Sequence, residues 1–386
     1  MKVNGQVLDL FVDLEKEPYD WRKDIIINKS KLLEKIEEVN QTDNFILLKR
    51  SVAFIKSIVN FPKSDKEGLV NIDQNGDTMV LKKGPILEEL SQIEESQTME
   101  RAKYYLDRLK KGISEIKTSK INDINLNRWK EYQDILTDSL WILDKRDDSG
   151  VHAGWYWGNF IPQIPHQLMM RYTKKDDWVL DPFLGSGTTL IECRRMGRNG
   201  IGVELNPETA KKAKELISKE FDANNIITEV ITGDSRKVKL EETLDKLGIK
   251  QVQLVIMHPP YHDIIKFSKD EEDLSNAKTT EAFVNMFGEV LDKTTPYLEK
   301  GRYLGIVIGD KYYKGTWIPL GFYIMNEVLK RDFSLKSIIV KNFEETRGKR
   351  NQKELWRYRA LVGGFYIFKH EYILLFKKGK VKNASV

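Results

Sequence analysis

The stretch 178–196 constrains the fold most, because a short apolar segment, a glycine turn and a helical segment follow one another there. Trp178–Leu180 predicts a buried strand that ends in an acid, Asp181, and the residues after Gly187 predict a helix. This order brings a small polar ligand against the backbone at the carboxyl end of a parallel strand. Gly185 and Gly187 carry no side chain, so the ligand can approach the main chain closely.

The glycine turn differs from a dinucleotide-binding fingerprint, because it lacks the third glycine and contains an acid that would repel a pyrophosphate. An acid at this position suits a ligand that carries an ammonium group. A second motif, His258-Pro-Pro-Tyr261, follows the continuously apolar segment Gln253–Met257, which predicts a central parallel strand. Its two prolines fix the backbone and remove two amide donors, which leaves carbonyl groups free as acceptors.

These two motifs, Asp181-Pro-Phe-Leu-Gly-Ser-Gly-Thr-Thr189 and His258-Pro-Pro-Tyr261, resemble those of the S-adenosylmethionine-dependent DNA methyltransferases of the amino class. Enzymes of that class modify the exocyclic amino group of adenine (N6) or cytosine (N4). The resemblance covers about residues 155–377. It implies an α/β fold with a seven-stranded, Rossmann-like class I methyltransferase sheet, and S-adenosylmethionine as the cofactor.

The chain is expected to form two domains, with residues 151–386 as the catalytic domain. Strands and helices alternate there. Residues 1–150 predict a mainly helical accessory domain that would recognise DNA, because four segments place apolar residues at helical spacing. These segments are Ser30–Val39, Ser51–Asn60, Ile86–Ile93 and Ala102–Leu109.

Three acids, Asp181, Glu204 and Asp234, each close one of three successive predicted strands. A carboxylate such as Glu204 at the end of the second strand can accept both ribose hydroxyls, and Asp234 can accept the adenine amino group. The resemblance adds a segment before the glycine turn that lines the methionine end of the cofactor. The predicted cofactor-binding residues are Phe160, Pro162, Asp181, Phe183, Gly185, Ser186, Gly187, Thr188, Glu204 and Asp234.

The resemblance also implies the catalytic residues, namely His258, Pro259, Pro260 and Tyr261. The His258 side chain and the Pro259 carbonyl would accept the two protons of the target amine, and Tyr261 would stack on a base flipped out of the duplex. The family usually has Asp, Asn or Ser in place of His258, although a neutral imidazole still offers one acceptor nitrogen. Cys193 lies in no Pro-Cys context, which excludes methylation at cytosine carbon-5.

The insert 342–369 between the last two predicted strands exceeds an ordinary hairpin loop, which favours a function for it. It interleaves basic and aromatic residues, and such residues contact phosphates and stack on bases. A solvated cationic loop is the alternative interpretation. The predicted nucleic-acid-binding residues are Arg347, Lys349, Arg350, Trp356, Arg357 and Arg359.

Composition limits the remaining possibilities. No apolar run approaches the ~20 residues of a membrane span, and Met1–Gly5 lacks the apolar region of a secretory signal. A single cysteine fits the reducing cytoplasm, and no His or Cys residues have metal-ligand spacing, so neither a membrane nor a metal is expected. The net charge of +5 permits nucleic-acid binding.

The expected function is therefore site-specific DNA methylation in the cytoplasm, with adenine favoured over cytosine. The resemblance implies double-stranded DNA and a cognate restriction endonuclease as partners. Two alternatives stay open: an RNA methyltransferase acting on guanine-N2, and a non-catalytic nucleic-acid-binding subunit. The first usually has an RNA-binding front domain with a mixed sheet, and the second would have impaired cofactor acids.

Overall fold

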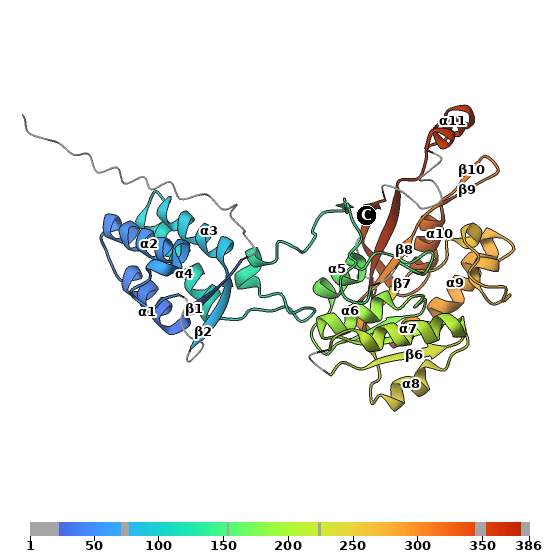
Figure 1. Ribbon diagram of the computed structural model, residues 1–386, viewed down its shortest axis with the longest axis horizontal. Helices are drawn as coiled ribbons and strands as arrows, with labels where there is room; N and C mark the ends of the chain where they lie inside the picture. Colours follow the sequence, from blue (N-terminus) through green and yellow to red (C-terminus); the bar gives the residue numbers. More distant parts are fainter. Residues whose placement is uncertain (1–22, 71–76, 153, 223–224, 344–352, 380–386) are drawn as a thin grey trace, which may run out of the picture. The chain divides into compact units, whose positions relative to one another are not determined.

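A computed structural model describes residues 23–70, 77–152, 154–222, 225–343 and 353–379. The chain divides into two compact units (Figure 1). The first comprises Met1–Thr118 and Asn125–Gln133, and the second Ser119–Ile124 and Asp134–Val386. The second unit thus begins before the boundary expected at residue 150.

The first unit is mainly helical, as its helical periodicities predict, with a small antiparallel sheet that they do not. Its four α-helices enclose an apolar core that includes Leu48, Leu90 and Leu106. The two strands pair through Asp24 and Lys82 at one end and Asn28 and Thr78 at the other. The elements are β1 (Asp24–Asn28), α1 (Lys29–Asn40), α2 (Phe45–Asn60), the 3-10 helix η1 (Pro62–Ser64), β2 (Thr78–Lys82), α3 (Lys83–Glu94), α4 (Met99–Ser114) and the 3-10 helix η2 (Leu126–Glu131).

The second unit is built on one eight-stranded sheet of order β3-β11-β12-β8-β7-β4-β5-β6. Seven of these strands confirm the class I methyltransferase sheet that the resemblance implies, and the two-residue β3 adds an eighth at the edge. The strands β4 to β8 run parallel to one another, whereas β12 is antiparallel to both β8 and β11. Their bounds are β3 (Leu140–Trp141), β4 (Trp178–Asp181), β5 (Asn199–Glu204), β6 (Thr228–Thr232), β7 (Val252–Met257), β8 (Leu298–Ile308), β11 (Phe333–Asn342) and β12 (His370–Lys378).

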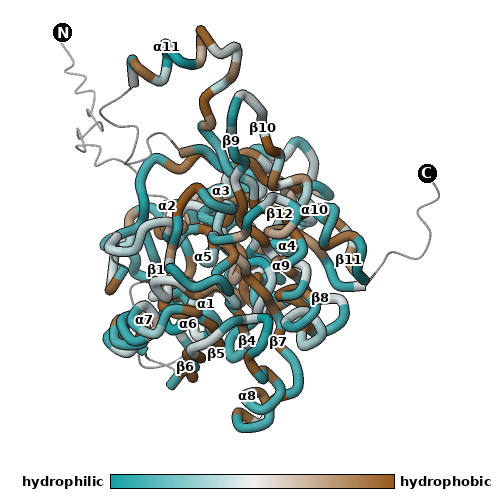
Figure 2. The backbone as a smooth tube through the Cα atoms, turned by 90° about the vertical axis from the view of Figure 1, so that its right-hand side faces the viewer, coloured by the Kyte–Doolittle hydropathy of each residue, from teal (hydrophilic) through white to brown (hydrophobic). Residues whose placement is uncertain are grey.

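Helices cover both faces of this sheet, because alternate residues of its central strands are apolar in both directions. On β7, Val255 and Met257 pack into a core with α8, α9 and α10, whereas Leu254 and Ile256 pack into a core with α5 and α6. Figure 2 shows the hydrophobic character of the central strands. The helices are α5 (Gln163–Tyr172), α6 (Thr188–Met196), α7 (Pro207–Lys219), α8 (Leu240–Lys246), α9 (Thr280–Thr294), α10 (Leu320–Leu329) and α11 (Lys353–Gly363).

Short elements complete the second unit. The predicted insert contains α11, and a separate two-stranded sheet, β9 (Lys311–Tyr313) and β10 (Thr316–Ile318), follows β8. Both extend beyond the large sheet (Figure 1). The 3-10 helices are η3 (His262–Ile264), η4 (Leu274–Asn276) and η5 (Thr295–Tyr297).

Candidate active site

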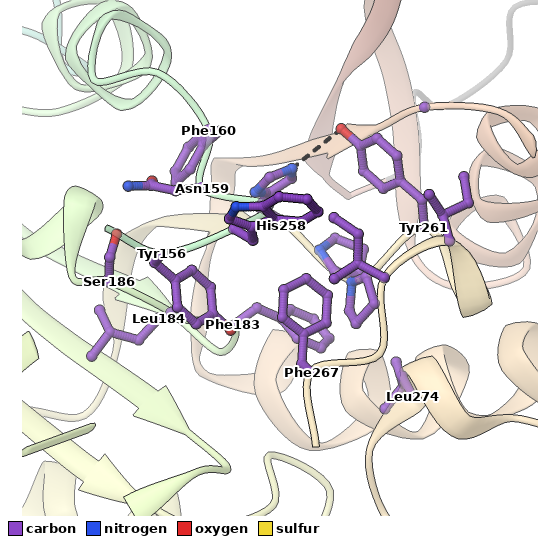
Figure 3. A pocket seen from close by; sticks show the side chains of 18 of the residues that line it. Tyr156, Asn159, Phe160, Phe183, Leu184, Ser186, His258, Tyr261, Phe267 and Leu274 are labelled. Carbon is purple, nitrogen blue, oxygen red and sulfur yellow. Dashed lines mark hydrogen bonds between the residues drawn. The ribbon is translucent and has the colours of Figure 1, made fainter. Parts of the chain in front are cut away.

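A cavity of about 630 Å³ lies where the glycine turn after β4 meets the loop after β7. The two strands are parallel neighbours, so their carboxyl ends open at the same edge of the sheet. Figure 3 shows side chains from both segments facing one space. The predicted site residues in its wall are Phe160, Phe183, Gly185, Ser186, Glu204, Asp234, His258, Pro259, Pro260, Tyr261 and Trp356.

The glycine turn owes its shape to two residues in the left-handed region, Gly185 at φ +54° and Gly187 at φ +88°. Such angles favour glycine because they bring a Cβ atom into steric conflict. A Cβ at Gly185 would also lie 3.0 Å from a ring carbon of Tyr156. The N–H of Gly185 donates to Glu204 Oε2 at 2.8 Å, which ties the turn to the end of β5.

Asp181 lies beneath the turn and is not among the residues of the cavity wall. Its side chain is fully buried, and its carboxylate accepts the Phe183 N–H at 2.9 Å and the Thr189 hydroxyl at 2.5 Å. Burial raises the pKa of Asp181 to about 6. Asp181 therefore stabilises the loop from inside. The backbone of the loop and neighbouring side chains, rather than Asp181, form the surface that a ligand would contact.

Three further predicted cofactor residues also lie outside the wall of the cavity. Gly187 is the N-cap of α6, Pro162 precedes α5, and Thr188 donates its hydroxyl to Asn159 Oδ1 at 2.7 Å. Thr188 therefore holds a cavity-lining residue in place.

Asn159 is a site residue that the sequence analysis did not select, although it lies next to Phe160. It lines the cavity, and its Oδ1 accepts from Thr188. Its Nδ2 is buried and has no hydrogen-bond partner among the described residues. An amide donor in this state suits an acceptor such as a ligand carboxylate, because a buried donor without a partner is costly.

Glu204 ends β5 and reaches the cavity with a side chain that is largely buried. Its Oε1 accepts the Asn206 N–H at 2.9 Å, in addition to the bond from Gly185. Burial raises the pKa of Glu204 to about 7, although both hydrogen bonds favour the charged form. The nearby Asp181 and Asp273 act in the same direction as burial.

Asp234 also lines the cavity, but its carboxylate already has a cationic partner. Arg236 donates from Nη2 to Asp234 Oδ2 at 2.8 Å and from Nε to Oδ1 at 3.0 Å. Arg236 fixes the orientation of this acid. Arg236 belongs to none of the motifs that predict the site.

His258 and Tyr261 stand at the other side of the cavity. The His258 ring lies 4.9 Å from the Phe160 ring between centroids, and its Nε2 lies 3.2 Å from the Tyr261 hydroxyl (Figure 3). Burial lowers the pKa of His258 to about 4, so the imidazole is neutral near pH 7. The ring of Tyr261 rests against Gly309, where a Cβ would lie only 2.7 Å from a ring carbon.

The predicted nucleic-acid contacts divide into two groups. Arg347, Lys349 and Arg350 lie outside the described residues. Trp356 lines the cavity from α11, whereas Arg357 and Arg359 of the same helix are exposed.

Within the described residues, no group of three or more His, Cys, Asp or Glu side chains could hold a metal ion. None of the helices there has the length and apolar character to cross a membrane.

Known proteins similar to this chain are methyltransferases. Type II methyltransferase M.MjaII of Methanocaldococcus jannaschii is 26% identical in an alignment 255 residues long, which covers 58% of this chain and 44% of the relative. Type II methyltransferase M.SmaI of Serratia marcescens is 56% identical over 79 residues, or 20% of this chain and 26% of the relative. The chain thus spans less than half the length of either relative.

Among solved structures, TrmN from Thermus thermophilus is 14% identical, with a TM-score of 0.37 over 57% of this chain and 49% of that chain. A family model described as DNA methylase, for the N6/N4 class, matches residues 5–215 and 252–385. The methyl donor of this class is S-adenosylmethionine. The match covers most of the sequence, and the chain therefore belongs to the N6/N4 class of DNA methylases.

Proposed function

We propose that this chain is a site-specific DNA methyltransferase that modifies the exocyclic amino group of a flipped base. Adenine N6 is the proposed acceptor, with cytosine N4 as the alternative. The observation that carries the proposal is a cavity lined by both Gly185 and Pro259, from the loops after two parallel neighbouring strands. A methyl donor and a nucleobase must meet within one such space.

The cofactor half of the cavity offers groups that match a zwitterionic nucleoside. When bound, S-adenosylmethionine supplies an activated methyl group on a sulfonium. Gly185 admits close approach to the main chain, Glu204 would accept the ribose hydroxyls, and the free amide donor of Asn159 suits the carboxylate. Phe160 and Phe183 add apolar walls, and Asp234, oriented by Arg236, would face the adenine.

The target half of the cavity offers acceptors for an amine. The neutral imidazole of His258 has one bare nitrogen, and no hydrogen bond from the described residues reaches the Pro259 carbonyl. Two acceptors would hold the two amine protons and orient the nitrogen lone pair. Orientation of this kind supplies a large part of a rate enhancement. Tyr261 would then stack on the base after it leaves the duplex.

Contact with DNA is proposed for α11, where exposed Arg357 and Arg359 accompany the cavity-lining Trp356. Such an arrangement joins phosphate contacts to a stacking side chain beside the target pocket. The first unit is proposed as the accessory domain for recognition, and a restriction endonuclease as a partner. The cytoplasm is the proposed location.

The decisive experiment incubates the full chain with methyl-labelled S-adenosylmethionine and either double-stranded DNA or RNA, and then identifies the labelled nucleoside by mass spectrometry. Label in N6-methyladenine supports the proposal, and label in N4-methylcytosine selects the alternative base. Label in N2-methylguanosine from RNA would overturn it. DNA binding without transfer to either substrate would indicate a non-catalytic subunit.

A further inference from the structure

Four polar side chains form a hydrogen-bonded series along one side of the cavity, and two of them come from the last two strands of the sheet. Lys341 Nζ donates to Glu371 Oε1 at 2.9 Å. The Tyr261 hydroxyl donates to Glu371 Oε2 at 2.8 Å, and His258 Nε2 lies 3.2 Å from that hydroxyl. All four residues line the cavity, and both Lys341 and Glu371 are more than nine-tenths buried.

The strand register brings Glu371 to this place. Lys341 on β11 and Glu371 on β12 are direct antiparallel partners, so the lysine faces the carboxylate across the pair. A buried carboxylate without a partner would be costly, and this ion pair offsets that cost. The side chains of Lys341 and Glu371 therefore form an ion pair in the wall of the cavity.

The positions of the hydrogens follow from the donor and acceptor capacity of each group. An ionised carboxylate only accepts, so the single hydroxyl hydrogen of Tyr261 points to Glu371. The Tyr261 oxygen must then act as the acceptor toward His258. The hydrogen of the neutral imidazole consequently lies on Nε2, which leaves Nδ1 bare.

The surroundings of His258 agree with this assignment. Burial lowers the pKa of its imidazole to about 4; Lys341 acts in the same direction and Glu371 opposes it. Within the described residues, His258 Nδ1 accepts no hydrogen bond, and this nitrogen is not fully buried. Nδ1 is thus an accessible acceptor in the wall of the cavity.

We propose that Glu371, held by Lys341, is a positioning residue that acts through Tyr261 to fix the Nε2–H tautomer of His258, so that Nδ1 accepts a proton of the target amino group. This inference rests on the proposed function. An Asp or Ser side chain at position 258 would present an acceptor without help. A histidine presents one only in the correct tautomer, which gives Glu371 a task that an Asp or Ser at position 258 would not require.

Glu371→Gln tests the proposal because it keeps the shape and reverses the polarity. The carbonyl oxygen of the introduced amide would turn to Lys341, and its NH₂ group would donate to the Tyr261 oxygen. The Tyr261 hydroxyl would then donate to His258 Nε2, which moves the imidazole hydrogen to Nδ1. The Nδ1–H group, a hydrogen-bond donor, would then face the target amino group, which needs an acceptor. We therefore expect kcat to fall about 10- to 100-fold with little change in KM.

The primary readout is the tautomer itself, measured at pH 7.5 by long-range ¹H–¹⁵N correlation on the full chain labelled at its five histidines. His258→Asn assigns the signal. We expect the Nε2–H pattern in the wild type and the Nδ1–H pattern in Glu371→Gln. An Nδ1–H wild type, or a tautomer unchanged in Glu371→Gln, would overturn the proposal.

Two further variants guard this test against a general structural effect. Glu327→Gln is the matched control, because Glu327 is similarly buried and paired with Arg331 but does not line the cavity. It should change neither tautomer nor kcat. Tyr261→Phe removes the connecting hydroxyl, so adding Glu371→Gln to it should cost no further activity; an additive loss contradicts action through Tyr261.

The tautomer measurement needs neither cofactor nor DNA. If the wild type shows the Nε2–H pattern and yet methylates no nucleic acid, the proposed function fails while the hydrogen assignment is supported.

Discussion

At the scale of a single residue, burial and hydrogen bonding act in opposite directions on the pKa of Glu204. Burial raises its pKa to about 7, above the ordinary value of 4.5, although two backbone N–H groups stabilise its anion. The folded chain therefore binds more protons than the unfolded chain between these values. The resulting stabilisation is fully present below pH 4.5 and is lost as the pH rises through 7.

The affinity for S-adenosylmethionine should show the opposite trend. Ribose hydroxyls donate to the ionised carboxylate, so binding must expel the proton below the pKa of Glu204. We expect Kd to fall by at most about tenfold per pH unit up to pH 7 and to level off above it. Isothermal titration calorimetry in buffers of different ionisation enthalpy would measure both the affinity and the proton release.

Glu204→Gln is the control, because glutamine keeps an acceptor but does not titrate. Its Kd should be higher than that of the wild type at pH 8 and nearly constant from pH 6 to 8. A wild-type affinity that does not vary over this range would contradict the assignment of Glu204 to the ribose.

Gly309 gives a second prediction at the residue scale. It follows β8, lines the cavity and supports the ring of Tyr261, where an added Cβ would lie 2.7 Å from a ring carbon. Gly309→Ala should displace that ring and lower kcat about 10- to 100-fold, because small errors of position are costly in catalysis. Steady-state kinetics together with cofactor titration would check this, since the Kd for S-adenosylmethionine should stay within about twofold. A proportional loss of cofactor affinity would mean that Tyr261 does not act on the target side.

At the scale of helices and strands, features that depend on residues close together in sequence were easier to predict than features that depend on pairing between distant segments. Asn206 is a residue type that favours helix N-caps, and its side chain accepts from the N–H groups of Glu208 and Thr209 at the start of α7. The helix Thr188–Met196 has the predicted bounds. Both outcomes depend on residues adjacent in sequence, where capping and glycine conformations act.

The missed elements and site residues depend on distant partners. β3 has only two residues and exists through its pairing with β11. Glu371 lies far from Tyr261 in sequence, and only the register of β11 and β12 brings it to the cavity. Within the insert, Leu361 and Val362 of α11 are exposed. The helix therefore lacks a row of buried apolar residues, which is the sequence pattern that predicts an amphipathic helix.

The exposed arginines of α11 give a prediction at this scale. If Arg357 and Arg359 contact phosphates, the double variant Arg357→Gln/Arg359→Gln should weaken DNA binding at low salt. It should also reduce the slope of log K against log salt by about 1 per lost contact. Fluorescence anisotropy with labelled duplex over a salt series measures both quantities.

The charge-matched control lies on α7, where Lys211 and Lys214 are exposed. Lys211→Gln/Lys214→Gln changes the net charge equally but should leave the slope nearly unchanged. Equal effects of the two double variants would show that net charge, rather than α11, governs binding.

At the scale of the whole molecule, each compact unit has apolar cores of its own among the described residues, in the first unit between its helices and in the second on both faces of the large sheet. All residues of the candidate active site belong to the second unit. A ligand stabilises only the folded unit that binds it. Thermal unfolding of the full chain should therefore show two transitions, of which S-adenosylmethionine raises one.

Differential scanning calorimetry can assign each transition with matched core variants. Leu48 in the first unit and Leu291 in the second are both fully buried, so Leu→Ala at either position should cost about 2–5 kcal/mol. Leu48→Ala should lower only the transition that does not respond to cofactor, whereas Leu291→Ala should lower only the one that does. At 100 times its Kd, S-adenosylmethionine should add about 2.7 kcal/mol to the second unit alone. A single transition that both variants lower and the cofactor raises would mean that the two units unfold together, because their cores would then share one cooperative equilibrium.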